Sequence, residues 1–136
     1  FAARHPCTRV FSNLGVQRYF SLMKTAAAMV GNSSSGLIES GSFALPVLNI
    51  GIRQDGRIRG PNVLDASCSA DALRQGLEQI LAPAFRTSIQ NMINPYGTGK
   101  ASEIIVERLK NVPLNERLLR KRFFDLPAPP TGNATP

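Results

Sequence analysis

The sequence contains few of the residues that build disulfide frameworks and metal sites. It has two cysteines, Cys7 and Cys68, one histidine, His5, and no tryptophan. The two cysteines lie far apart and are not accompanied by a set of histidine ligands, so the pattern predicts neither a disulfide framework nor a zinc site. We therefore expect no metal or other cofactor, and we expect the reducing cytoplasm as the location.

Long apolar runs are also missing. No run approaches the roughly 20 residues that span a bilayer, and no charged and then apolar leader precedes a small-residue cleavage site. We therefore expect neither a membrane partner nor secretion. With 136 residues, 43% of them hydrophobic, the chain has the length of one domain, and a chain of this size buries roughly two thirds of its unfolded surface.

Acidic residues are scarce relative to basic ones. Nine Asp and Glu face 16 Lys and Arg, giving a net charge of +7 and a pI of about 10.3. Such a charge suits nucleic acid, anionic lipid or a phosphorylated substrate. The basic residues gather in the loop that carries Arg53, Arg57 and Arg59 and in the stretch 108–122, which reads as a solvated helical face. Because no aromatic platform interleaves with them, we expect no nucleic-acid partner, whose mark would be steep salt dependence.

The most informative stretch is residues 31–36, Gly-Asn-Ser-Ser-Ser-Gly, here called the serine turn. It follows the apolar run 26–30 and opens a helix expected over 36–44. The first N–H groups of a helix have no intrahelical partner, and the helix dipole adds roughly half a positive charge there. Ser33, Ser34 and Ser35 add hydroxyl donors, and Gly31 and Gly36 let a ligand approach the backbone. The turn thus suits an anion, although serine-rich helix starts also occur as plain N-caps.

Glu39 follows Ser35 by four residues, which places it one turn further on the same helix face. A carboxylate beside a phosphate site needs another role, and accepting two sugar hydroxyls is a natural one, as an acidic residue does for ribose in dinucleotide sites. Helical glutamates are otherwise mostly solvated. The pattern favours a nucleotide-diphosphate site, with serines and amides on phosphate and Glu39 on ribose.

Apolar spacing predicts strands alternating with helices. Strands are expected at 8–14 around Arg9-Val10-Phe11, at 29–30, at 46–50 and at 62–65. Helices are expected at 16–28, at 36–44, from Ser69 or Asp71 to Leu81, from Pro83 onward, at 101–110 and at 114–124. This alternation predicts an α/β fold, a Rossmann-like parallel sheet with helices on both faces.

In such sheets, ligands bind outside the carboxyl ends of the strands. The loops after Leu14, after Val30 and after Ile50 would all lie at that edge. The sequence therefore places the serine turn, the glycine-rich loop 51–61 with its arginines, and the backbone of Leu14 around one crevice.

The domain organisation follows from the two ends of the sequence. A doubly wound domain would normally have another βα unit before Thr8, so we expect a piece of a longer chain. We assign residues 1–124 to one domain that lacks its first βα unit. Residues 125–136 are expected to form a flexible tail, since residues 126–136 hold four of the ten prolines.

Several spaced motifs, from about Thr8 to Leu109, together resemble the C-terminal domain of the UDP-N-acetylglucosamine 2-epimerases, specifically the hydrolysing branch. The matching segments are Met29-Val30-Gly31-Asn32-Ser33-Ser34-Ser35-Gly36, Glu39, Pro46-Val47-Leu48-Asn49-Ile50-Gly51, Arg53-Gln54 with Gly56-Arg57, Asn62-Val63, and Asn94-Pro95-Tyr96-Gly97 with Gly99.

The resemblance implies one half of a two-domain fold like that of the B-type glycosyltransferases, with UDP held in the interdomain cleft. It implies that Ser33 and Ser34 hold the diphosphate, that Glu39 holds the ribose hydroxyls, and that the backbone near Leu14 reads the uracil. Ser35 and Gly36 complete the turn in this assignment, and Arg53 and Arg57 approach the phosphates or the sugar.

The resemblance also implies a reaction. The family eliminates UDP from UDP-N-acetylglucosamine through a glycal-like intermediate, and the hydrolysing branch adds water to give N-acetylmannosamine, the entry to sialic-acid-type sugars. The family's acidic and histidine catalytic residues lie mostly in the N-terminal domain. His5 falls outside the matched motifs, so we predict no catalytic residue in this chain, which would be inactive without the N-terminal domain of the same enzyme.

Other interpretations stay open from the sequence. A glycosyltransferase of the same overall shape would transfer the sugar instead of releasing it, and a binding module without catalysis would only sense UDP-sugars. The residues do not distinguish N-acetylglucosamine from variants such as diacetylated sugars. A cleft-facing surface without its N-terminal domain could also self-associate into a homo-oligomer.

Overall fold

The computed structural model describes residues 1–120. Its contacts divide the chain into two units, residues 1–100 and residues 101–136, which are described separately. The first unit holds the sheet and the serine turn. The second holds two helices in its described part, residues 101–120.

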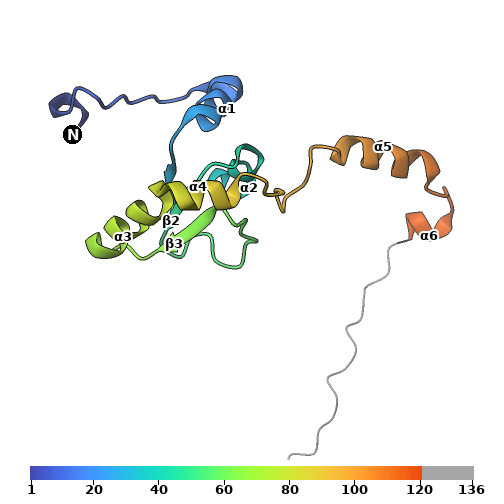
Figure 1. Cartoon of the computed structure of the whole chain (residues 1–136). Coiled ribbons are helices and arrows are strands. Elements are labelled where there is room, and N and C mark those ends of the chain that lie inside the picture. The colour runs from blue at the N-terminus through green and yellow to red at the C-terminus, as the bar shows by residue number, and fades with distance from the viewer. Residues whose placement is uncertain (121–136) are drawn as a thin grey trace, which may run out of the picture. The chain divides into compact units, whose positions relative to one another are not determined.

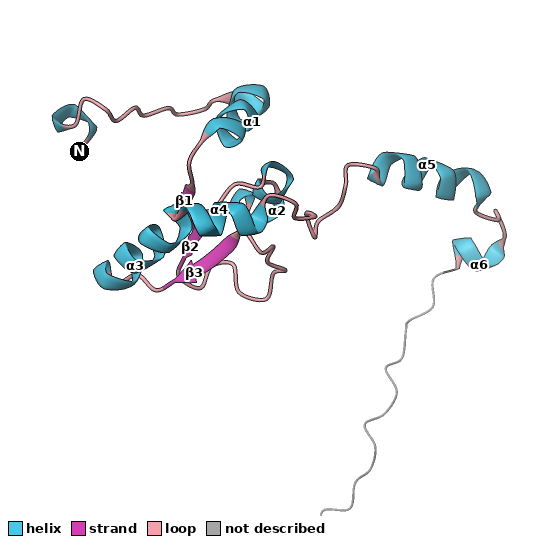
Figure 2. Ribbon diagram, in the orientation of Figure 1, coloured by secondary structure: helices cyan, strands magenta, loops and turns pink. Residues whose placement is uncertain are grey.

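The first unit is built on a parallel sheet of three short strands (Figures 1 and 2). They are β1 (Met29–Gly31), β2 (Val47–Ile50) and β3 (Val63–Ala66), in the order β1-β2-β3. Val47 lies opposite Met29 on one side and Val63 on the other. The three strands predicted from residue 29 onward are confirmed, and they make the predicted Rossmann-like α/β arrangement.

The central strand shows why helices cover both faces of the sheet. Side chains of Val47 and Leu48 point to opposite faces because they are neighbours in a strand. A Cβ on Gly36, in α2 (Ser35–Ile38), would lie 3.1 Å from Val47 Cγ1. A Cβ on Gly76, in α3 (Ala70–Leu81), would lie 2.5 Å from Leu48 Cδ1. The two helices therefore pack against opposite faces, and β2 is buried between them.

Helix α3 begins and ends as its sequence predicts. Of the two predicted caps, Ser69 is the one that acts, since its hydroxyl accepts a hydrogen bond from the N–H of Ala72 at 3.2 Å. Ala82 ends the helix in an extended conformation, and Pro83 starts α4 (Pro83–Ile89). Ile80 and Ile89 are buried, which anchors both helices in the core.

The predicted strand over residues 8–14 is wrong. Residues 8–14 pair with no strand of the described chain, and Val10 and Phe11 are 78% and 61% exposed. Strand preference mainly reflects how well a side chain packs on a half-buried sheet surface, and these residues have no such surface. Before them lies the short helix η1 (Ala2–Arg4), and after them α1 (Gly15–Thr25), where Met23 is buried.

The single helix predicted over 36–44 is also wrong in detail. Helix α2 has only four residues, and the tighter 3₁₀ helix η2 (Ser40–Phe43) follows it. Serine and glycine are weak helix formers, and the Ser40 hydroxyl donates to the Gly36 carbonyl at 2.5 Å. Ala44 ends the segment in the left-handed region, with φ of 45°.

Between β2 and β3 the chain runs through a loop, residues 51–62, that contains no helix. Parallel strands are usually joined by a crossover helix, so this connection is unusual, and the sequence predicted it as a polar loop. Gly51 and Gly56 adopt positive φ angles of 72° and 78° where the loop turns. The loop leaves the carboxyl end of β2 and carries the three arginines.

The described part of the second unit consists of α5 (Ala101–Asn111) and α6 (Glu116–Leu119). The helix predicted over 101–110 is confirmed. Of the helix predicted over 114–124, residues 116–119 are helical, and residues 121–124 lie outside the described residues, as does the predicted tail 125–136. In the described chain no helix could span a membrane: α3, with 12 residues, falls short of the roughly 20 required.

Candidate functional site

The serine turn meets the glycine-rich loop 51–61, here called the arginine loop, at the carboxyl edge of the sheet, as predicted. The carbonyl oxygen of Asn32 accepts a hydrogen bond from Arg53 Nη1 and another from Gln54 Nε2, both at 2.7 Å. Asn32 follows β1 directly and Arg53 follows β2, so both groups lie where parallel strands present their carboxyl ends. Two donors from one loop thus fix the start of the serine turn.

Gln54 is a buried polar side chain that the sequence does not single out. Its side chain is only 2% exposed, and its Oε1 has no hydrogen-bond partner among residues 1–120. The amide must point its nitrogen at the Asn32 carbonyl, because a carbonyl oxygen only accepts. Gln54 belongs to one of the matched motifs, but no role for it follows from the sequence, since nothing in its local pattern signals burial.

Glu39 is held by a second network. The Ser35 hydroxyl donates a short hydrogen bond to Glu39 Oε2, and the hydroxyl of Tyr19 lies 2.7 Å from Ser35 Oγ. A hydroxyl has one hydrogen to donate, and Ser35 gives its hydrogen to the carboxylate. Tyr19 must therefore be the donor to Ser35. The predicted proximity of Ser35 and Glu39 is confirmed, whereas the sequence places Tyr19 only within the helix expected at 16–28.

The groups left available to an anion are those of Ser33 and Ser34. Within the described residues, the backbone N–H groups of Ser33 and Ser34 donate to no protein acceptor. The hydroxyl of Ser34 does not cap α2, while Ser33 Oγ accepts from the N–H of Ser35 at 3.4 Å. The two amides and the Ser34 hydroxyl therefore make no hydrogen bond with the described residues and are available to a ligand.

Packing gives Gly36 a further reason to be small. It is buried, and its missing side chain lets α2 approach Val47, so the close contact is with the sheet. Because α2 has only four residues, its dipole is weaker than that of the longer helix predicted. The site therefore depends on individual donors more than on a helix dipole.

A hollow borders Leu14 and Tyr19. A cavity of about 440 Å³ is lined by residues 11–16 and Tyr19. A smaller one, about 150 Å³, is lined by Leu14, Tyr19, Leu45 and apolar side chains between residues 22 and 29. The N–H of Gly15 is already bound to Asn13 Oδ1 at 2.7 Å. Tyr19 thus touches both this hollow and the Ser35–Glu39 pair, which places Leu14 beside the same site.

The three loop arginines have different surroundings. Arg59 Nε lies 2.6 Å from Asp65 Oδ2, although its N–H is not aligned with that oxygen, and Arg59 Nη2 lies 3.2 Å from Asp55 Oδ1. The contact with Asp65 raises the pKa of Arg59. Arg57 is exposed, and among the described residues its guanidinium has no polar contact that joins it to the serine turn. Arg53 is therefore the arginine that the structure brings to the site.

The described residues 1–120 offer no cluster of metal-binding side chains. No group of three His, Cys, Asp or Glu side chains lies close enough there to bind a metal ion. His5, as expected, is a surface residue, and its ring stacks on Phe1 at 3.8 Å between centroids. Cys7 and Cys68 are free and exposed.

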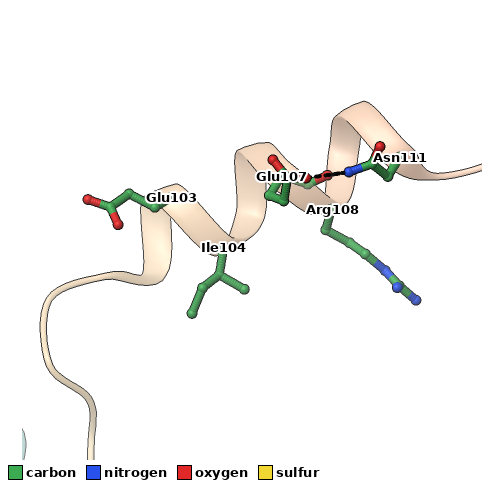
Figure 3. Close-up of a pocket in the computed structure, with 5 residues that line it drawn as sticks. All are labelled: Glu103, Ile104, Glu107, Arg108 and Asn111. Atoms are coloured by element: carbon green, nitrogen blue, oxygen red, sulfur yellow. Dashed lines mark hydrogen bonds between the residues drawn. The ribbon is translucent and has the colours of Figure 1, made fainter.

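In the second unit a hollow of about 580 Å³ runs along α5 (Figure 3). Five side chains line it, and Asn111 Nδ2 donates to Glu107 Oε1 at 2.6 Å. All five come from one helix, so they form a helix surface and do not enclose a ligand. The serine turn remains the better candidate.

Comparison with known proteins connects this geometry to a family. Residues 2–110 match the family model described as UDP-N-acetylglucosamine 2-epimerase. The chain is 46% identical over 119 residues to the GDP/UDP-N,N'-diacetylbacillosamine 2-epimerase (hydrolyzing) of Campylobacter jejuni, covering 87% of this chain. It is 39% identical over 118 residues to the UDP-N,N'-diacetylbacillosamine 2-epimerase (hydrolyzing) of Legionella pneumophila, covering 86% of this chain.

A third relative, polysialic acid biosynthesis protein P7 of Escherichia coli, is 32% identical over 119 residues and covers 88% of this chain. In all three cases the chain spans 30% of the length of the relative. The family match includes the serine turn, Glu39 and the arginine loop, the same segments that the fold gathers at one edge of the sheet. The chain belongs to the UDP-N-acetylglucosamine 2-epimerase family.

Proposed function

We propose that this chain is the UDP-binding domain of a hydrolysing UDP-N-acetylglucosamine 2-epimerase, and that UDP lies on the serine turn. The observation that carries this is the position of Glu39. Its carboxylate is fixed by Ser35, one helical turn from the available N–H groups of Ser33 and Ser34. An acceptor for hydroxyls next to donors for an anion matches a ribose joined to a diphosphate.

The residue roles follow from this placement. Ser33 and Ser34 take the diphosphate, Glu39 takes the ribose hydroxyls, and the hollow beside Leu14 takes the uracil. Ser35 acts through its contact with Glu39, since its hydrogen is already donated. Arg53, whose guanidinium is already at the turn, supplies positive charge, and the exposed Arg57 is the further cation of the same loop.

These groups suit an elimination reaction. When UDP leaves the sugar, negative charge grows on the diphosphate, and fixed donors stabilise that charge in the transition state. Contacts to uracil and ribose hold the leaving group in one orientation. Proton transfer needs a general base within reach of the proton that it removes. We assign this base to the remainder of the enzyme.

The rest of the reaction belongs to the longer protein. The chain spans 30% of the length of its relatives, and we propose that an N-terminal domain of the same enzyme completes a two-domain, B-type glycosyltransferase-like cleft. The isolated chain would then bind UDP and turn over no UDP-N-acetylglucosamine. Product analysis on the full-length protein separates an epimerase, which releases N-acetylmannosamine and UDP, from a glycosyltransferase, which transfers the sugar.

A second candidate substrate has support from the relatives. Two of them are named for UDP-N,N'-diacetylbacillosamine and share 39% and 46% identity with this chain, whereas a relative named UDP-N-acetylglucosamine 2-epimerase, from Neisseria meningitidis, shares 25%. In our assignment this domain reads the nucleotide and leaves the sugar ring to the other domain. Both UDP-sugars should therefore be offered to the full-length enzyme.

The binding step is tested by titrating UDP calorimetrically into the chain and into Ser34→Ala and Glu39→Ala. Hydrogen bonds to charged groups contribute about 1.5–3 kcal/mol, so each variant should bind UDP about 10- to 100-fold more weakly. Ser88→Ala, an exposed serine on α4, is the matched control and should bind like the wild type. A folded wild type that binds no UDP, or variants that bind it equally well, would contradict the proposal.

A further inference from the structure

We propose that the hydroxyl of Tyr19 determines how strongly the site recognises ribose, although this hydroxyl does not itself contact the ribose. It would act as a positioning residue through the chain of hydrogen bonds from Tyr19 to Ser35 to Glu39. This inference rests on the proposed function, because it assigns the ribose hydroxyls to Glu39.

The direction of the hydrogen bonds is fixed by counting hydrogens. The carboxylate of Glu39 can only accept, so Ser35 donates to it. The remaining lone pairs of Ser35 accept, and the Tyr19 hydroxyl, 2.7 Å away, supplies the hydrogen. The alternative acceptor for Tyr19, the sulfur of Met29, lies 4.0 Å away and is a weak acceptor. Each donor therefore has one main acceptor.

This arrangement selects one orientation of the Glu39 carboxylate. Oε2 is engaged by Ser35, which leaves Oε1 to accept from a hydroxyl of a ligand. A hydroxyl that accepts a hydrogen bond becomes a better donor, because hydrogen bonds in a chain polarise one another. Tyr19 thus both restricts the rotation of the Ser35 hydroxyl and strengthens its bond to Glu39.

Tyr19 also connects the Glu39 carboxylate to the hollow beside Leu14, which we assign to the uracil. Its ring lines the cavities beside Leu14, while its hydroxyl reaches Ser35. Tyr19→Phe keeps the ring and its contacts and removes only the hydroxyl. The substitution therefore separates the hydrogen-bond role from packing.

The test compares UDP with 2′,3′-dideoxy-UDP, which has the same base and diphosphate but lacks both ribose hydroxyls. Wild type, Tyr19→Phe and Tyr96→Phe are titrated with each nucleotide. Tyr96 is the other tyrosine of the chain, and its hydroxyl donates to the Ile58 carbonyl at 2.9 Å. Loss of a single neutral hydrogen bond changes affinity by about three- to tenfold.

We expect Tyr19→Phe to bind UDP about three- to tenfold more weakly and to bind the dideoxy nucleotide within about twofold of the wild type. Tyr96→Phe should keep the wild-type ratio between the two nucleotides. In a Ser35→Ala background, Tyr19→Phe should cause no further loss, because the chain is already broken.

Any other outcome would contradict the proposed role of Tyr19. Equal losses for both nucleotides, or no loss for either, would overturn the role of Tyr19 while leaving the nucleotide site intact. A further loss in the Ser35→Ala background would also overturn it. If the folded wild type binds neither nucleotide, the proposed function fails first and this inference fails with it.

Discussion

At the residue scale, two donors reach the same carbonyl oxygen of Asn32, but they differ in burial. Arg53 is exposed, while Gln54 is almost fully buried, and its Oε1 lies inside the protein without a hydrogen-bond partner among the described residues. A hydrogen bond in a water-excluded site is electrostatically stronger and more costly to lose than one in solvent. Gln54 should therefore hold the serine turn more firmly than Arg53 does.

Gln54→Glu tests this difference because it keeps the size of the side chain and removes its N–H donors. A buried carboxylate would then face the Asn32 carbonyl, and we expect the free energy of unfolding to fall by about 2 kcal/mol or more. Amide hydrogen exchange should accelerate at Ser35, Gly36 and Leu37, whose N–H groups donate to Ser33 and Ser34 of the turn. Both effects are measured on the same labelled sample, by urea denaturation and by NMR.

Arg53→Ala is the matched control, since it removes the other donor to the same oxygen. Its cost should stay below about 1 kcal/mol, as is usual for exposed side chains. Equal effects of the two substitutions, or unchanged exchange in Gln54→Glu, would show that the turn does not depend on the buried amide.

The sequence predicted that Ser35 and Glu39 meet, but it did not predict the side chains that hold the serine turn and Glu39 in place. Ser35 and Glu39 meet because four-residue spacing on a helix brings side chains together, and that local rule holds even in the short α2. Tyr19 and Gln54 lie far from the serine turn in the sequence, and their side chains reach it only in the folded chain. No local pattern encodes such distant contacts, so their roles appear only in the folded chain.

At the element scale, the contact between α3 and β2 fixes one face of the sheet. Leu48 has no exposed surface, and its methyl groups occupy the space that a side chain at Gly76 would need. The helix can lie this close to the strand only because position 76 has no Cβ. Gly76 costs the helix some intrinsic stability, and the close packing compensates for it.

Gly76→Ala should therefore destabilise the chain, although alanine is the better helix former. Overpacking a core costs about 1–3 kcal/mol, and the gain in helix propensity returns at most about 1 kcal/mol, so we expect a net loss of about 1–2 kcal/mol in urea denaturation. Adding Leu48→Val should restore part of the loss by making room for the new methyl group.

Gln75→Ala, at an exposed neighbouring position on α3, provides the control and should change stability by less than about 0.5 kcal/mol. A Gly76→Ala chain as stable as the wild type, or a Leu48→Val addition that only worsens the loss, would contradict the close packing of α3 on β2.

Elements whose burial is encoded locally were predicted well, and the others were not. The run Val47-Leu48-Asn49-Ile50 forms the central strand, and its first three residues are buried. Residues 8–14 have strand-forming side chains but no neighbour to pair with, which a single sequence does not show. The helix expected over 36–44 shortens because the Ser40 hydroxyl bonds back to the Gly36 carbonyl.

At the scale of the whole molecule, the net charge of +7 attracts any anion. General attraction would spread UDP over the exposed arginines and lysines, whereas the proposed site predicts binding at one edge of the sheet. The central claim is therefore a claim about location. Affinity alone would not separate a built site from a charged surface.

The most direct measurement is a ¹⁵N NMR titration of the chain with UDP, with inorganic pyrophosphate as the comparison. We predict that the largest amide shifts with UDP occur at Ser33 and Ser34, followed by the backbone around Leu14, and that pyrophosphate shifts the serine turn but leaves Leu14 unchanged. Shifts spread over the exposed arginines and lysines of the chain, or shifts that are the same for both ligands, would contradict a nucleotide site on the serine turn.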